Sequence, residues 1–434
     1  MPEDDTVGRL QQKLGAAAKT NKRRRFHALR DKVYRWDVLC QAWEEVRENQ
    51  GAPGVDGMTI QEVEKRGMDV FLRELQEELR TGTYRPLPVR RVLIPKPDGG
   101  QRALGIPTVR DRVAQAAARI VLEPVFEADF LPCSFGFRPN RSAQGAAEEV
   151  CKWLNFGMEN VLDADIKACF DEIPHGRLLD AVARRVSDKA ILRLVRMWLK
   201  AGVMVGGGVQ ASEEGTPQGG VISPLLANIY LHQFDAEWNR RGLAQRHSAD
   251  AQLVRYADDF VVLSRKSVRG LVPVVQEILG GLGLRLNLEK SRVVRAEKGF
   301  DFLGFRFVRR YSQKRGKQVT HYFPSPKSVK RVKEKVRDRC GRHMLHVPPV
   351  DVVRMVNRLL VGWRNYFRYS NAIRVFDKVQ TYSEQRLRRF LRRRRTKPGL
   401  GLYRDCTNEF LREELGLVCI AGRGSVRYWS RGAV

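Results

Sequence analysis

The sequence has few cysteines, no long apolar run and too few acidic residues to balance its basic ones. Its seven cysteines are an odd number, scattered along the chain without a CxxC pair, which is typical of reduced thiols in a cytoplasmic protein. No apolar run approaches the roughly 18 residues of a membrane span, and the first residues lack the basic start and apolar middle of a signal peptide. We therefore expect a soluble, cytoplasmic chain with no membrane partner.

A structural zinc site is not expected either. The segment CGRHMLH offers Cys340, His343 and His346, but this is not a usual zinc spacing and no fourth ligand is near. We interpret the three residues as surface positions near the end of a basic helix.

The excess of basic residues points to a polyanionic partner. Lysine and arginine number 79 against 49 for aspartate and glutamate, a net charge of +30 in 434 residues. Such a charge repels itself unless a polyanion shares the surface, and nucleic acid is the leading candidate, ahead of an acidic membrane surface. Because 43% of the residues are hydrophobic, we expect a folded protein of two or three domains.

Composition shifts divide the chain into three expected parts. Residues 1–50 are polar with helical spacing and precede the glycine-rich break GAPGVDG. Residues 51–315 alternate predicted strands and helices. Residues 316–434 are helical in pattern and rich in arginine, most of all in RLRRFLRRRRTK (386–397). A charge run is often only a solvated face, but the aromatic residues that precede this one favour nucleic-acid binding.

The segment ENVLDADIKACFDEIP (159–174) carries the first candidate acid. Its pattern predicts a short apolar strand that ends at Asp165, then a turn and a helix that begins near Pro174. Asp165 would then lie at a strand end, where a ligand can reach it.

The segment RYADDFVVLS (255–264) carries two more acids. It predicts strands over 253–256 and 260–264, joined by a tight turn with Asp258 and Asp259. Aspartate is common in turns, so an ordinary acidic turn is the competing interpretation.

Three carboxylates at strand ends and turns would form the oxygen-rich site that hard divalent cations prefer. Two Mg²⁺ ions roughly 3.5–4 Å apart can activate a 3′-hydroxyl and stabilise a leaving pyrophosphate. Without a cation, the like charges would only repel one another. The acids therefore indicate a metal-dependent site, provided that the two segments meet in space.

Nine segments, in order along nearly the whole chain, resemble the bacterial group II intron-encoded reverse transcriptases, or maturases. They are GVDG (54–57), VLIPKPDGGQRALGIPTVRDRVAQ (92–115), SFGFRPNRSAQGA (134–146), DADIKACFDEIPH (163–175), EGTPQGGVISPLLANIYLHQFD (214–235), RYADDFVVL (255–263), LNLEKS (286–291), FDFLGF (300–305) and GWRNYFRYSN (362–371). The resemblance implies an α+β right-hand polymerase: fingers and an antiparallel, RRM-like palm sheet over 51–315, and a helical, RNA-binding thumb over 316–434.

The resemblance also implies the catalytic residues. Asp165, Asp258 and Asp259 would be the catalytic, metal-binding triad, with the backbone carbonyl of Ile166 as a further ligand. Asp163 is a rival because period-two alternation puts it on the same face of the strand, but the family's aspartate is the one followed by Ile-Lys. The implied cofactor is a pair of Mg²⁺ ions, with Mn²⁺ as a substitute.

Five residues match family positions that bind the deoxynucleotide. Phe170 would floor the sugar pocket and exclude a 2′-hydroxyl, although a plain core phenylalanine is the alternative. Gln218 lies in a glycine-containing turn, which has a purely structural interpretation as well. Lys96 and Arg102 flank PDGG, a hairpin turn signal, and with Lys290 they would contact phosphates unless they are ordinary surface charges.

The expected nucleic-acid contacts lie mostly in the thumb. Tyr256 would touch the primer end and the nucleotide pocket. In the thumb the candidates are aromatic residues and arginines near them in the sequence: Trp363, Arg364, Tyr366, Arg392, Arg393, Arg394 and Arg395.

We therefore expect an RNA-directed DNA polymerase whose partners are an RNA template, a DNA primer or target, deoxynucleotides and the intron RNA. It would assist splicing and mobility of that intron. No segment resembles the family's DNA endonuclease or an RNase H domain, so we expect the endonuclease-lacking type. Alternatives are a domesticated relative in defence or DNA repair, or an RNA-binding splicing cofactor that does not polymerise. The sequence does not indicate the oligomeric state.

Overall fold

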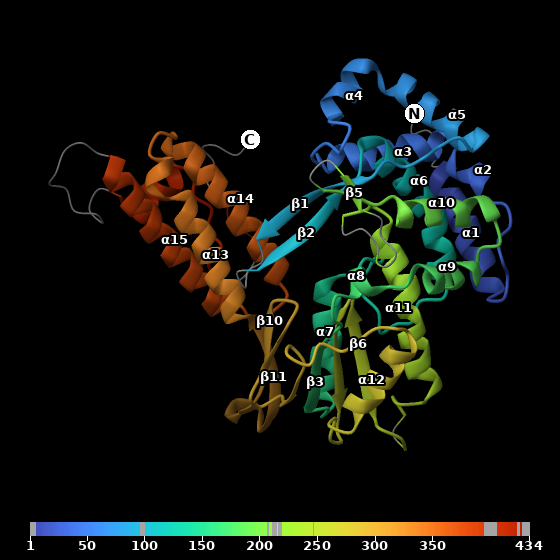
Figure 1. The fold of residues 1–434 in the computed structure, drawn as a ribbon. Helices are drawn as coiled ribbons and strands as arrows, with labels where there is room; N and C mark the ends of the chain where they lie inside the picture. The colour runs from blue at the N-terminus through green and yellow to red at the C-terminus, as the bar shows by residue number, and fades with distance from the viewer. Residues whose placement is uncertain are drawn as a thin grey trace. The chain divides into compact units, whose positions relative to one another are not determined.

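The computed structural model describes residues 6–95, 100–205, 208–210, 215, 219–245, 247–394, 406–422 and 426–427. Within it the chain forms two compact units (Figure 1). The first unit comprises residues 1–142, 164–260 and 269–292, and the second comprises 143–163, 261–268 and 293–434.

Helices dominate the start of the first unit because their apolar residues recur at helical spacing. The central one is α6 (Val109–Glu127), which buries most of its side chains and packs against its neighbours α1 and α3. The others are α1 (Thr6–Thr20), α2 (Arg30–Val33), α3 (Trp36–Glu48), α4 (Ile60–Arg66) and α5 (Met68–Thr81).

A four-stranded sheet follows these helices, with strand order β2-β1-β4-β5. Strands β1 (Val89–Pro95) and β2 (Gln101–Ile106) pair antiparallel, as the predicted hairpin requires. β1 also pairs in parallel with β4 (Val203–Val205), which pairs antiparallel with β5 (Gly208–Gln210).

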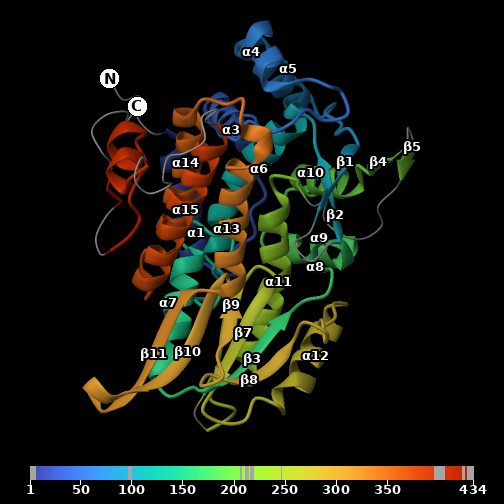
Figure 2. The same cartoon turned by 90° about the vertical axis from the view of Figure 1, so that its left-hand side faces the viewer.

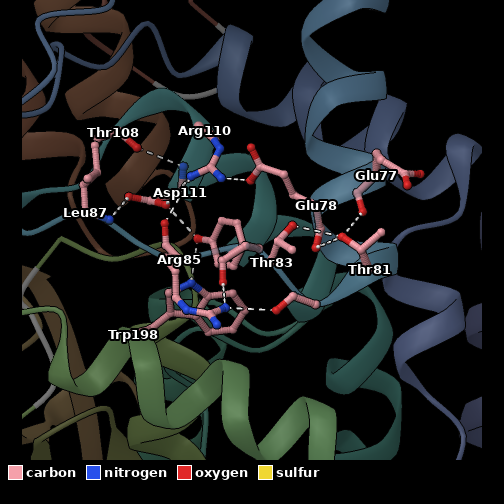
Figure 3. Close-up of polar contacts among 12 residues, drawn as sticks. Glu77, Glu78, Thr81, Thr83, Arg85, Leu87, Thr108, Arg110, Asp111 and Trp198 are labelled. Atoms are coloured by element: carbon pink, nitrogen blue, oxygen red, sulfur yellow. Dashed lines mark hydrogen bonds and ion pairs between the residues drawn. The ribbon is translucent and has the colours of Figure 1, made fainter.

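A buried carboxylate ties the base of this sheet to α6. The Asp111 carboxylate accepts hydrogen bonds from the Tyr84 hydroxyl at 2.6 Å and the Leu87 amide at 3.1 Å (Figure 3). Trp198, on α10 (Lys189–Lys200), donates to the same Tyr84 hydroxyl at 3.0 Å. Burial raises the pKa of Asp111, and the bond from Tyr84 opposes that shift. These hydrogen bonds join three segments that are distant in the sequence, around Tyr84, Asp111 and Trp198.

A second four-stranded sheet carries the predicted acids, with strand order β6-β7-β3-β8. Its strands are β3 (Asn160–Asp165), β6 (Ala251–Tyr256), β7 (Asp259–Ser264) and β8 (Arg292–Arg295), of which Figure 2 labels β3, β7 and β8. The helices between β3 and β6 are α8 (Cys169–Glu172), α9 (His175–Ala183), α10 (Lys189–Lys200) and α11 (Ser223–Arg240), and α12 (Leu271–Gly281) lies between β7 and β8. This βαββαβ order is that of a ferredoxin-like sheet.

The remaining elements belong to the second unit. Strands β9 (Phe300–Phe302), β10 (Phe305–Ser312) and β11 (Lys317–Pro324) form an antiparallel sheet, against which α7 (Ala143–Asn155) packs. Three long helices lie side by side and share an apolar core (Figure 1). They are α13 (Pro326–Arg339), α14 (Pro349–Phe367) and α15 (Ile373–Arg394), and short turns η1 (Gln313–Arg315), η2 (Arg342–Met344) and η3 (Phe410–Glu414) complete the described part.

The α+β class predicted from the sequence is confirmed, and helices α13, α14 and α15 lie in the region predicted to be helical. Within the described residues, no helix combines the length and apolar character that a membrane crossing needs.

Candidate active site

Two strand ends that the sequence predicted separately meet in the first unit. Asp165 ends β3, and the amide of the next residue, Ile166, donates a hydrogen bond to the carbonyl of Asp258 at 3.3 Å. The Asn287 amide donates to the Asp165 carbonyl at 2.8 Å, which fixes the strand end from its other side. The predicted metal site required that the two acidic segments meet in space, and this backbone hydrogen bond links them directly.

The turn between β6 and β7 is tight and strained. It comprises Ala257 and Asp258, and Ala257 has the left-handed φ of +56°, which is uncommon for a residue with a Cβ atom. Asp258 is half-buried, whereas Asp259 is exposed. A Cβ atom on Gly136 would lie 2.5 Å from the Ala257 amide nitrogen. The turn can therefore pack here only because position 136 is glycine.

A buried ion pair supports the turn from behind. Arg255, with no exposed surface, donates to the Asp235 carboxylate through Nε at 2.8 Å and Nη2 at 2.5 Å. The same guanidinium donates to the Ala257 carbonyl at 3.0 Å and the Ser134 hydroxyl at 2.8 Å. Burial alone would lower the pKa of Arg255, but Asp235 raises it, so the cation persists.

The carboxylate of Asp165 has two polar partners. Asn287 donates to its Oδ2 at 3.2 Å, and the Lys290 ammonium lies 3.4 Å from the same oxygen. Burial raises the pKa of the Cys169 thiol, and the charges of Asp258 and Asp165 add to that shift. Nevertheless, no three His, Cys, Asp or Glu side chains in the described ranges are arranged to hold a metal ion.

Phe170 and Tyr256 lie on segments adjoining these acids, and both are half-buried. Phe170 belongs to the short helix α8. Gly215 approaches the backbone of this helix so closely that a Cβ atom on Gly215 would lie 2.9 Å from the Phe170 carbonyl oxygen. The ring of Tyr256 lies 6.2 Å from that of Phe137.

Several predicted nucleotide contacts cannot be placed by their side chains. Lys96 and Gln218 lie outside the described residues, as does Arg395 of the thumb. For Arg102 only the backbone is described, paired with Ile94 in the β1/β2 ladder.

The predicted thumb residues divide by burial. Arg392 and Arg393 are exposed at the end of α15, and Arg394 donates to the Val347 carbonyl. Trp363 and Tyr366 are half-buried on α14.

Arg364 differs from the other predicted contacts of the thumb. It is only 4% exposed and donates to the Ile420 carbonyl at 2.9 Å. A guanidinium held by a backbone carbonyl inside the unit is poorly placed for phosphate, so the structure favours an internal, structural role for Arg364.

Sequence reasoning missed the residues that hold the turn: Arg255, Asp235, Ser134 and Gly136. All four lie in segments that carry the family resemblance, but no role was predicted for them. An arginine inside an otherwise apolar strand was the available signal, because a buried charge requires a partner.

Comparisons with known proteins give two family matches. Residues 94–307 match the family described as reverse transcriptase (RNA-dependent DNA polymerase), and residues 329–410 match the group II intron maturase-specific domain.

Individual relatives agree with these matches. Protein YkfC of Escherichia coli is 35% identical over 358 residues, which cover 74% of this chain and 93% of that protein. The group II intron-encoded protein LtrA of Lactococcus lactis is 36% identical over 216 residues, 47% of this chain and 34% of LtrA. An uncharacterized 91 kDa protein in the cob intron of Schizosaccharomyces pombe is 28% identical, covering 77% of this chain and 49% of that protein. The match thus spans half or less of the last two relatives.

Proposed function

This chain belongs to the family of group II intron-encoded reverse transcriptases and maturases, and from that premise we propose that Asp165, Asp258 and Asp259 serve primer extension on an RNA template. The family makes the chain an RNA-directed DNA polymerase by class. The residue roles, the two-metal mechanism and the service to an intron are our proposals.

One observation carries the catalytic proposal: the hydrogen bond from the Ile166 amide to the Asp258 carbonyl at 3.3 Å. It holds the end of β3, which bears Asp165, against the turn residue Asp258, and Asp259 follows as the first residue of β7. Carboxylate oxygens are the donors that hard divalent cations prefer. The Lys290 side chain beside Asp165 is 64% exposed, so it can swing away when a cation occupies the carboxylate.

In the proposed reaction the three carboxylates would hold two Mg²⁺ ions, with the Ile166 carbonyl as an additional ligand. Bound Mg²⁺ would lower the pKa of the primer 3′-hydroxyl and stabilise the leaving pyrophosphate. Phe170 would floor the sugar pocket, and Tyr256 would position the primer end. Gln218, Lys96, Arg102 and Lys290 would contact the nucleotide.

The second half of the proposal is that residues 316–434 hold intron RNA during splicing and intron mobility. The exposed Arg392 and Arg393 at the end of α15 support it, because phosphate binding requires accessible cations. The domesticated role stays an alternative, and intron RNA domains flanking the reading frame would decide between them.

The catalytic proposal is tested by Asp258→Asn in the full chain. The variant should extend a DNA primer on an RNA template at least about a thousandfold more slowly, the order of loss seen when one member of a catalytic group is removed. Its affinity for intron RNA should be unchanged.

Asp163→Asn is the matched control, because Asp163 is the rival acid on β3. It should keep most of the extension rate. Full activity of the Asp258 variant, or equal losses in both variants, would overturn the triad assignment.

A further inference from the structure

A cavity of about 340 Å³ lies within the second unit, along the contact between α13 and α14. Its volume is within the roughly 300–1,000 Å³ typical of small-ligand sites. The turn at Leu303 and Gly304 lines it as well. We call it the interhelical cavity.

One wall of the interhelical cavity is basic. Arg331 and Lys335 line it from α13, four residues apart and therefore on one face of that helix. Both side chains are exposed, and neither has a hydrogen bond or ion pair to another described residue. Helix α13 itself carries seven basic residues and two acidic ones, so the wall is suited to an anion.

The opposite wall is aromatic. Trp363 and Tyr366 line it from α14, and the Tyr366 hydroxyl donates to the Leu303 carbonyl at 2.9 Å, which fixes that ring. The Trp363 indole nitrogen is buried and, among the described residues, has no hydrogen-bond partner. Buried donors are normally satisfied, so this N–H is an exception among the described residues.

We propose that the interhelical cavity takes up one unpaired nucleobase of bound RNA, with the neighbouring phosphates on Arg331 and Lys335. Proteins recognise RNA largely through unpaired bases that stack on aromatic side chains. The inference rests on the proposed function, because it requires that this unit binds RNA.

The charge of α13 argues against an apolar protein segment as the occupant. Such a segment would bury Arg331 and Lys335 without a partner, which costs free energy. A nucleotide supplies both an aromatic face and an anion.

The test uses the full chain and an RNA duplex that contains one bulged 2-aminopurine, a fluorescent base. The same duplex without the bulge is the reference. The unmodified protein should bind the bulged RNA at least about fivefold more tightly, the lower end of what one stacked base contributes. The 2-aminopurine fluorescence should change on binding.

Arg331→Ala with Lys335→Ala should remove most of that preference and the fluorescence change. The matched control is Lys327→Ala with Arg337→Ala, which removes the same charge from exposed positions of the same helix that do not line the cavity. The control should weaken binding to both RNAs alike. An equal effect of the two double variants on the preference would overturn the proposal.

Leu359→Trp fills the interhelical cavity, which Leu359 lines, and keeps every charge. It should remove the preference and leave affinity for the unbulged duplex unchanged. A retained preference in a folded Leu359→Trp variant would contradict the proposal, and if this variant fails to fold, the two double variants decide.

Failure of this inference is distinguishable from failure of the proposed function. A protein that binds both RNAs equally and extends primers refutes only the base-binding role of the cavity. A protein that binds neither RNA and extends no primer refutes both.

Discussion

The arginine beside the β6/β7 turn of the first unit and the arginines at the end of α15 in the second unit differ in burial and in hydrogen bonding. Arg255 is fully buried, and its donors go to Asp235, Ala257 and Ser134. Arg392 and Arg393 are exposed on α15 and have no partner among the described residues. Arg255 is part of the protein interior, whereas Arg392 and Arg393 are accessible to another molecule.

The difference teaches that a net charge of +30 does not locate a nucleic-acid surface. Arg364 and Arg388 belong to the basic helices, but both are buried and donate to backbone carbonyls. What identifies a phosphate contact is an accessible guanidinium without an internal partner, and variants of Arg255 and of the Arg392/Arg393 pair test this distinction.

The largest effect is expected from Arg255→Met. Removing one partner of a buried ion pair leaves Asp235, also without exposed surface, as an uncompensated charge, which costs about 3–5 kcal/mol. The midpoint of denaturant unfolding should fall accordingly, and primer extension should be lost with the turn. Adding Asp235→Leu should recover part of the stability. An unfolding midpoint equal to that of the parent would contradict the structural role.

Phe170→Val tests the sugar pocket that we propose for Phe170. Removing the ring should admit a 2′-hydroxyl and raise incorporation of ribonucleotides relative to deoxynucleotides by roughly tenfold or more, measured by single-nucleotide extension. Phe170→Tyr keeps the ring and should keep the discrimination. If the valine variant discriminates as the parent does, Phe170 is a plain core residue.

Charge reversal at the exposed end of α15 tests the other side of the comparison. Arg392→Glu with Arg393→Glu should weaken RNA binding and reduce the slope of log affinity against log salt by about 2, one for each phosphate that the protein no longer neutralises. The unfolding midpoint should not change, because the two residues have no partner within the described chain.

The matched control for that pair is Arg80→Glu with Arg240→Glu. These arginines are also exposed, but each is paired with a glutamate three residues earlier. The control should alter the salt slope less. An equal change in both double variants would mean that the α15 arginines act only through net charge.

The smallest effect is expected from Lys290→Gln. An exposed cation contributes only about 0–1 kcal/mol, so KM for the deoxynucleotide should rise by at most about fivefold with kcat nearly constant. Lys290→Arg should retain the parental KM. A glutamine variant with unchanged KM would limit Lys290 to its ion pair with Asp165.

The parts of the site with a local signal could be predicted from the sequence. The predicted strands 253–256 and 260–264 correspond to Ala251–Tyr256 and Asp259–Ser264, and β3 ends at Asp165 as expected. Alternation and turn chemistry depend on neighbours in the sequence, so they can be read from one segment. The helix expected near Pro174 begins at His175.

The contacts between distant segments could not be predicted in this way. Asp235 lies on a helix 20 residues before Arg255, and Gly136 is farther still. The local sequence around Arg255 does not indicate which distant residues will contact it, because such contacts form only when the sheet is assembled.

The burial of Arg364 had a signal that went unused. Val356, Leu360, Arg364 and Phe367 are buried on α14, and their spacing of three to four residues defines one face of the helix. Helical periodicity therefore places Arg364 with the core, even though its sequence neighbours are aromatic and basic.

The buried guanidinium of Arg255 also affects which residues near the turn can be substituted. Because Arg255, Asp235 and Gly136 fix the shape of the turn from behind, substitutions at Tyr256 and Phe170 need not displace the acids. With the roles proposed for Phe170 and Tyr256, nucleotide choice can thus diverge in evolution, or be redesigned, without rebuilding the proposed reaction centre. Lysine could not replace Arg255, since a single ammonium lacks the planar fork that engages the carboxylate at two points.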